Sequence, residues 1–209
     1  MIKKNSLTLF EKKIDYKFKN ITLLEKSLTH PSYYQDSKKI TDKVNEFERL
    51  EFLGDRVLGL IISKKLIETY PEEKEGIIDK KLSNLVNRKT CSYIAKKINI
   101  RKFIILGSSQ KLLNRSEEKI TSDCLEALIG AIYLDTGFKS AEQFVLNFWE
   151  TQLNNSTMPL IDSKTQLQEY SLKRFKILPK YTFFKKTGPQ HKPLFKTEVQ
   201  IPESKKIIG

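Results

Sequence analysis

Cysteine and histidine are scarce in this sequence, whose 209 residues contain two of each. Cys91 and Cys124 have no CxxC spacing, so we interpret both as reduced thiols, and as small buried hydrophobic residues rather than nucleophiles. His30 and His191 are 161 positions apart and fall in different predicted domains. A zinc site or a cysteine-based site is therefore not expected.

Long hydrophobic runs are also missing. The longest apolar-rich run, Cys124–Leu134 (CLEALIGAIYL), contains Glu126 and is far shorter than the ~20 residues that cross a bilayer. The start of the chain, MIKKNSLTLFEKKI, has no hydrophobic segment typical of a secretory leader, and its acidic residues Glu11 and Asp15 are not typical of a transit peptide. We expect a cytoplasmic protein with no membrane partner.

Positive charge dominates, with 38 basic against 25 acidic residues and a formal net charge of +13. Such an excess favours nucleic acid or another anionic surface as a partner, although a lysine-rich solvated exterior would give the same total. The excess is concentrated toward the end of the chain, because residues 160–209 hold 11 basic and 4 acidic residues.

Hydrophobic periodicity predicts a mainly α-helical fold. A helix is predicted over about residues 46–70, ending before Pro71, and further helices over 77–98, 121–134 and 140–149. The composition then changes, and a helix over 164–174 and strands within 180–186 and 194–201 follow. The predicted organisation is a helical domain at 1–152, a linker at 153–161 and a small α+β domain at 162–209.

The first helix of this set carries an acidic stripe. NEFERLEFLGD (45–55) contains Glu46, Glu48, Glu51 and Asp55. At 100° per residue, the last three lie within about 60° of arc, and the apolar face is expected on the opposite side. The residues predicted for that apolar face are Leu50, Leu53, Val57, Leu60 and Ile61. A solvated acidic face is the ordinary explanation of such a stripe.

A second acidic pair argues for more than solvation. Asp123 and Glu126 share a helix face, and Glu126 is the one charge between Cys124 and Leu134. A carboxylate in so apolar a segment needs a cation, either a basic side chain from elsewhere or a metal ion. Mg²⁺ takes oxygen ligands, so two helices that bring these acids together would form a magnesium site.

The motifs resemble those of the ribonuclease III family, whose members are double-stranded-RNA endonucleases. ERLEFLGDRVLG (48–59) resembles the family's defining motif, and SDCLEALIGAIYLD (122–135) resembles its second acidic motif. SLTHPSYY (27–34) and EGIIDKKLSNLVNR (75–88) are similar to flanking family segments in the correct order. The resemblance covers about residues 10–150 and implies an all-helical nuclease domain.

Carried over position by position, the resemblance implies that Glu51, Asp123 and Glu126 bind the metal and that Asp55 and Glu126 are catalytic. The implied cofactor is Mg²⁺, with Mn²⁺ able to substitute, and no organic cofactor. The implied reaction hydrolyses phosphodiester bonds of double-stranded RNA to 5′-phosphate and 3′-hydroxyl ends. Precursors of ribosomal RNA, structured messenger RNA and transfer RNA are the implied substrates.

Three further positions match residues with other roles in the family. Glu48 and Glu75 match acids that support the site. Phe52 resembles an aromatic side chain that inserts into the partner subunit of a homodimer. A two-fold symmetric dimer suits a duplex, because its two equivalent sites face two antiparallel strands.

Residues after the linker resemble a double-stranded-RNA-binding domain, whose order is α-β-β-β-α. The chain ends at Gly209, soon after the second predicted strand, so the third strand and the last helix are expected to be missing. The resemblance places RNA contacts on the first helix and in the loop GPQH (188–191), at Thr165, Gln168, Glu169, Gly188, Pro189 and His191. We interpret Phe183, Phe195 and Val199 as core residues rather than base-stacking ones.

One alternative belongs to another class, a non-catalytic RNA-binding or assembly protein built on a nuclease fold. Loss of one or more metal-binding acids would mark such a protein, and all of them are present here. The sequence therefore favours a magnesium-dependent, homodimeric endonuclease of double-stranded RNA.

Overall fold

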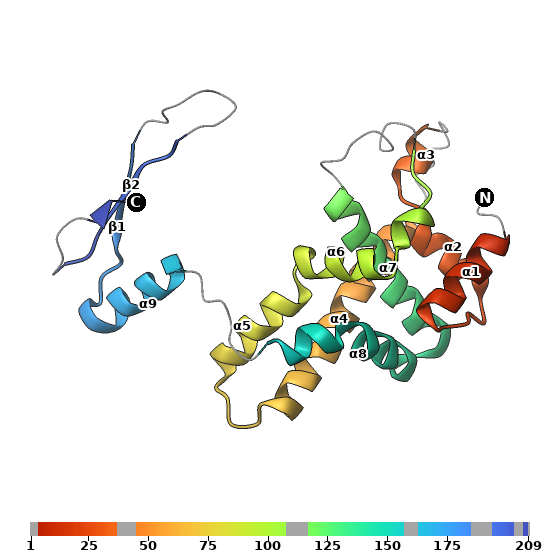
Figure 1. The fold of residues 1–209 in the computed structure, drawn as a ribbon, viewed down its shortest axis with the longest axis horizontal. Helices are drawn as coiled ribbons and strands as arrows, with labels where there is room; N and C mark the ends of the chain where they lie inside the picture. Colours follow the sequence, from red (N-terminus) through yellow and green to blue (C-terminus); the bar gives the residue numbers. More distant parts are fainter. Residues whose placement is uncertain are drawn as a thin grey trace. The chain divides into compact units, whose positions relative to one another are not determined.

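The computed structural model of the chain describes residues 4–36, 45–107, 117–156, 163–184, 194–202 and 207–208. The chain separates into two compact units, Met1–Pro159 and Leu160–Gly209. The described part of the first unit is helical apart from a single Thr29–Ile105 bridge, and the second unit combines one helix with a small sheet (Figure 1). The prediction of a mainly helical protein with a small α+β part is confirmed.

The described helices of the first unit follow the predicted order with longer bounds at several ends. They are α1 Lys4–Ile14, α2 Ile21–Leu28, α3 Ser32–Asp36, α4 Glu46–Thr69, α5 Glu75–Val86, α6 Arg88–Lys97, the 3₁₀ helix η1 Ile100–Lys102, α7 Glu117–Thr136 and α8 Phe138–Asn154. Helix α8 reaches Asn154 and so extends two residues into the predicted linker. None of the helices that the structure describes is long and apolar enough to cross a bilayer.

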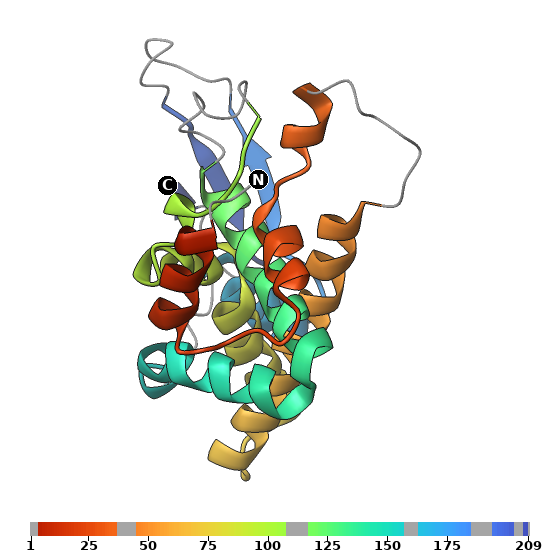
Figure 2. The ribbon, with the colours of Figure 1, turned by 90° about the vertical axis from the view of Figure 1, so that its right-hand side faces the viewer.

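Helix α7 is the centre of the first unit. It packs against α2, α4, α6 and α8, and Figure 2 shows it in green, running through the middle of the helical unit. Every residue from Ile120 to Ile132 is buried except Glu126, which is half-buried. A helix buried on nearly all sides must be apolar on nearly all sides, which is why its sequence shows little amphipathic period. The same packing leaves Glu126 at the edge of the core.

Helix α4 begins where the sequence predicts because Asn45 caps it. The Asn45 side chain accepts hydrogen bonds from the backbone N–H groups of Phe47 and Glu48, which have no partner within the helix. The helix ends at Thr69, before Pro71, and the predicted core residues Leu50, Val57 and Ile61 are buried. The predicted position of Leu60 in the core is wrong, since its side chain is 59% exposed.

A buried cation holds the turn between α4 and α5. The Lys81 side chain is 1% exposed, and its Nζ donates to Glu73 Oε1 at 2.9 Å. The same Nζ lies 3.3 Å from the centroid of the Tyr70 ring. A lysine so far from water is retained because its charge is met on both sides, by a carboxylate and by an aromatic face.

The last turn of α7 is tied to the segment before α2. Asp135 accepts hydrogen bonds from the backbone N–H groups of Lys19 and Asn20 and from the Tyr16 hydroxyl, each at 2.8 Å. Burial alone would raise the pKa of Asp135, but these hydrogen bonds to its ionised form hold that pKa below its usual value. Burial raises the pKa of Tyr16 to about 12.

The second unit contains α9 Ser163–Phe175 and an antiparallel sheet of β1 Lys180–Phe183, β2 Thr197–Gln200 and β3 Ile207–Ile208, in that spatial order. The expectation that the third strand is missing is wrong, because Ile207 and Ile208 pair with Val199 and Glu198. The strand is only two residues long, so it adds little to the sheet.

The predicted core positions on this sheet are only partly buried. Val199 is half-buried, but Phe183 and Phe195 are 75% and 72% exposed, so their assignment to the core is wrong. Exposure alone does not make either ring a base-stacking residue.

Candidate active site

The close crossing of α4 and α7 depends on two glycines. A Cβ added at Gly54 would lie 1.7 Å from the carbonyl oxygen of Glu126, and a Cβ at Gly130 would lie 2.2 Å from the carbonyl oxygen of Leu50. These distances are far below any real contact, so the two backbones touch because neither residue has a side chain. The crossing sets Glu51, three residues before Gly54, against Glu126, four residues before Gly130.

Three carboxylates meet at this crossing. Glu51, Asp123 and Glu126 each offer an oxygen, and these oxygens all lie within 4.8 Å of one another. Asp123 is buried, and the other two side chains are half-buried. Carboxylate oxygens at this spacing are the donor set that a hard divalent cation such as Mg²⁺ or Mn²⁺ takes. The residues present therefore fit a metal ion of this class.

The carboxylates of this cluster have too little positive charge near them to balance their negative charge. Burial, together with the negative charges of Asp55, Asp123 and Glu51, raises the pKa of Glu126 to about 7. Burial and the charge of Asp123 also raise the pKa of Glu51. A divalent cation between them would remove the repulsion that produces these shifts.

Two polar partners of the cluster were not foreseen from the sequence. Lys119 Nζ donates to Asp123 Oδ2 at 2.9 Å, and the Ser122 hydroxyl donates to Glu126 Oε1 at 3.3 Å. Both pairs have i, i+4 spacing on α7, so the signal was available once the helix was known to begin at Glu117. The sequence-based prediction placed the start of this helix at residue 121 and so left Lys119 outside it.

Asp55 and Glu48 lie beside the cluster rather than in it. Asp55 is one turn after Glu51, and its Oδ2 forms an exposed ion pair with Arg56 Nη1 at 2.9 Å. Its charge still acts on Glu126, where it is the largest carboxylate contribution to the raised pKa. Glu48 is exposed, and its charge also contributes to the raised pKa of Glu51.

Glu75 lies away from the three carboxylates within one chain. It is an exposed residue in the first turn of α5, just after the C-terminal end of α4. From Glu51 to Thr69 the rise along α4 is roughly 27 Å, so Glu75 does not reach the cluster of its own chain. Phe52 is 66% exposed on α4, and Arg56 stacks on its ring with 5.4 Å between the Cζ atom and the centroid.

The predicted RNA contacts of the second unit are only partly described. Thr165 and Gln168 are half-buried and Glu169 is exposed, and their spacing sets all three on one face of α9. Gly188, Pro189 and His191 lie outside the described residues.

Comparison with known proteins agrees with the motifs. A family model described as Ribonuclease-III-like matches residues 20–153. A Ribonuclease 3 of Pelagibacter ubique (strain HTCC1062) is 51% identical over 204 residues, which cover 98% of this chain and 88% of that protein. The chain belongs to the ribonuclease III family. The resemblance stated from the motifs is confirmed, and the chain is an enzyme of the endoribonuclease class.

Solved structures of the family share the fold. The nuclease domain of ribonuclease III from Campylobacter jejuni, at 35% identity, superposes with a TM-score of 0.61 and covers 78% of this chain and 100% of that one. A second structure of that domain, at 37% identity and a TM-score of 0.60, covers 68% and 94% of the two chains. It documents structural flexibility in the region involved in dimer formation of the Campylobacter protein.

Proposed function

We propose that this ribonuclease III family member is a homodimeric, Mg²⁺-dependent endonuclease that cuts double-stranded RNA in the cytoplasm and leaves 5′-phosphate and 3′-hydroxyl ends. Its proposed substrates are precursors of ribosomal and transfer RNA and structured messenger RNA. The observation that carries the proposal is the meeting of Glu51, Asp123 and Glu126 oxygens within 4.8 Å, on two helices held together by a glycine crossing.

The three carboxylates would hold the metal, and the remaining residues of the site would keep them in place. Bound Mg²⁺ supplies a water molecule of lowered pKa and positive charge for the leaving oxygen. Asp55 adds negative charge on the Glu126 side of the cluster, and the Ser122 hydroxyl fixes one Glu126 oxygen. Asp55 and Glu126 are the residues to which we assign catalysis, and Glu48 would support the Glu51 side.

The exposed face of α4 supports a homodimer. Phe52, Leu60 and Ile67 are 66%, 59% and 62% exposed and lie within about 80° of arc on the helix. An apolar stripe of this kind on a charged protein is typical of a surface that a partner covers. We propose that Phe52 inserts into the second subunit, which would set two equivalent carboxylate clusters against the two strands of a duplex.

The second unit would hold the duplex. Residues 160–209 contain 11 basic and 4 acidic residues, and the part of this unit that the structure describes forms one helix and a three-stranded antiparallel sheet. Thr165, Gln168 and Glu169 on α9, together with Gly188, Pro189 and His191, are the proposed contacts. Recognition of duplex RNA through its shape, 2′-hydroxyls and phosphates implies weak sequence preference.

The proposal is tested by measuring how fast the wild-type protein and the Glu126→Gln variant cleave a uniform RNA duplex, each in Mg²⁺ and in EDTA. Wild-type protein should cut only with Mg²⁺, and Glu126→Gln should lose at least about 10³-fold in rate, the order of loss for a group essential to transition-state charge stabilisation. The variant should remain folded. Because burial and neighbouring acids raise the Glu126 pKa, its ionisation costs stability above pH 7, and glutamine removes that cost. Wild-type cleavage in EDTA, or unimpaired cleavage by the variant, would overturn the assignment.

A further inference from the structure

A pocket between α1 and η1 lies apart from the carboxylates. It is lined by Leu9, Lys12, Lys13, Asn99, Lys102 and Phe103 and has a volume of about 400 Å³. That volume falls within the roughly 300–1,000 Å³ of small-molecule sites. None of its lining residues belongs to the acid cluster or to the apolar stripe of α4.

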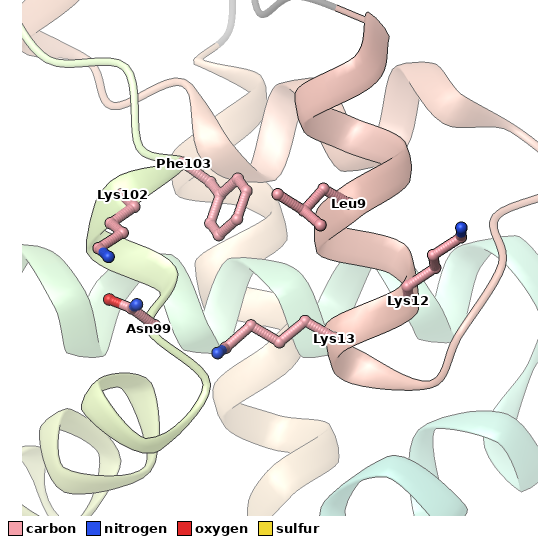
Figure 3. A pocket seen from close by; sticks show the side chains of 6 residues that line it. All are labelled: Leu9, Lys12, Lys13, Asn99, Lys102 and Phe103. Carbon is pink, nitrogen blue, oxygen red and sulfur yellow. The ribbon is translucent and has the colours of Figure 1, made fainter.

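The pocket has two chemically different sides. Figure 3 shows Lys13 and Lys102 extending toward Asn99, while Leu9 and Phe103 face each other on the other side and Lys12 points away. Leu9 is 60% exposed, whereas Phe103 is 9% exposed and its ring packs 4.6 Å from that of Phe10, so Leu9 provides most of the apolar surface that is open to a ligand. Lysine ammonium groups with an amide suit an anionic oxygen group, and an aliphatic and an aromatic side chain suit a flat apolar ring.

No ion pair with a described carboxylate neutralises the lysines of this pocket. Among the residues that the structure describes, none of Lys12, Lys13 and Lys102 forms an ion pair with a carboxylate. Asn99 has a left-handed backbone conformation, with φ of 55°, and its side chain makes no capping hydrogen bond to η1. Two ammonium groups and one amide therefore have donors to offer a ligand.

We propose that this pocket binds a nucleoside phosphate, with the phosphate between Lys13, Lys102 and Asn99 and the base against Leu9 and Phe103. A phosphate supplies the negative charge that would pair with the two lysine ammonium groups, and a nucleobase supplies a ring of the size that the apolar side accepts. The ligand is either a free nucleotide or one nucleotide of an RNA strand, since both present the same group.

Equilibrium dialysis in EDTA tests the site, because without metal a nucleotide has no bridge to the carboxylates. AMP should bind saturably below about 1 mM, the upper end of ordinary metabolite affinities. Adenosine and inorganic phosphate should each bind at least about tenfold more weakly, because each lacks one of the two interactions. AMP that binds no better than inorganic phosphate would overturn the proposal.

Variants locate the binding. Lys13→Ala and Lys102→Ala should each weaken AMP binding about tenfold, the order for one charge-assisted contact, and Leu9→Glu should abolish it. Lys139→Ala, at an exposed lysine of α8 outside the pocket, is the charge-matched control and should leave AMP binding unchanged. All four changes are at exposed positions, so unfolding temperatures should match the wild type. An equal loss with Lys139→Ala would show general charge attraction and refute the site.

A fourth ligand distinguishes the two sources. A short single-stranded oligoribonucleotide with a 5′-phosphate should bind at least about tenfold more tightly than AMP if the pocket holds one nucleotide of a strand, since neighbouring phosphates add contacts. Equal affinities for AMP and the oligonucleotide would identify a free nucleotide as the ligand. In either case Lys13→Ala must weaken the binding. The proposal is contradicted if AMP does not bind and Lys13→Ala leaves the affinity for the oligonucleotide unchanged.

Discussion

Substituting Gly54 by alanine should separate the two halves of the acid cluster. The added Cβ would lie 1.7 Å from the Glu126 carbonyl oxygen and 2.6 Å from its carbonyl carbon, where ordinary contact begins near 3.4 Å. The clashing atoms are backbone atoms of a buried helix, so they cannot rotate away. Helices α4 and α7 must instead move apart by about 1.7 Å at the crossing, which carries Glu51 away from Glu126.

The expected loss of stability is about 3 kcal/mol, at the upper end of ordinary overpacking because both sides of the contact are backbone. For a domain of this size, that corresponds to a fall of roughly 6–12 °C in the unfolding temperature. The rate of duplex cleavage should fall by about 10² or more, since catalytic geometry tolerates little displacement. Trp149, the single tryptophan, is fully buried in the helical unit and reports its unfolding by fluorescence.

Gly59→Ala is the matched control. It lies five residues later in α4, and a Cβ there meets nothing within 4 Å. Alanine should therefore stabilise the helix by about 0.5–1 kcal/mol and leave cleavage unchanged. If Gly54→Ala unfolds at the wild-type temperature and cuts at the wild-type rate, the glycine crossing does not position the carboxylates and the reasoning fails.

Three other changes test separate parts of the structure. Phe52→Asp should shift the protein from dimer to monomer in sedimentation, and an unchanged mass would contradict the proposed interface. Lys81→Ala should lose about 3–5 kcal/mol in urea unfolding, because it leaves Glu73 half-buried without its cation. Lys64→Ala, at an exposed lysine paired with the half-buried Glu142, should change stability little. Asp135→Asn should lose about 1 kcal/mol at neutral pH, discounted for solvent exposure. The pKa of Asp135 is lower in the folded state than in the unfolded state, where it is near 3.8. The stability difference between wild type and Asp135→Asn should therefore be fully present above pH 3.8 and vanish as the pH falls through the lower folded-state pKa. A stability difference that does not change with pH would refute this explanation.

The sequence predicts helix α4 well because local signals suffice. Asn45 provides the cap, Pro71 ends the helix, and buried apolar residues between them recur at spacings of three and four residues. The face of α7 is harder to predict, since that helix is buried on nearly all sides and its period is weak. Even so, Glu126 stood out as the one charge in an apolar run, and it is the residue that packing leaves at the edge of the core.

The membership of the cluster could not come from helical geometry alone. The wheel of α4 groups Glu48, Glu51 and Asp55, but only Glu51 meets Asp123 and Glu126 within 4.8 Å. Glu51 meets the other two acids because α4 and α7 cross at Gly54 and Gly130. The sequence of one helix does not show where another helix will cross it. The same limit applies to Glu75, whose distance from the cluster follows from the length of α4 and the turn before α5.

The small sheet shows a further limit. Alternation predicts its first two strands, but strand β3 pairs through backbone groups of two residues near the chain end, which no side-chain period signals. The exposure of Phe183 and Phe195 depends on what covers the sheet, and a period-2 pattern indicates only that the two faces differ.

Crystals of the protein soaked in Mn²⁺ would test the central claim most directly, through the anomalous scattering of the ion. We expect a peak coordinated by oxygens of Glu51, Asp123 and Glu126 at about 2.2 Å, and its loss in crystals of Glu126→Gln. A wild-type crystal with no manganese between these three carboxylates, or with the ion bound elsewhere, would contradict the account.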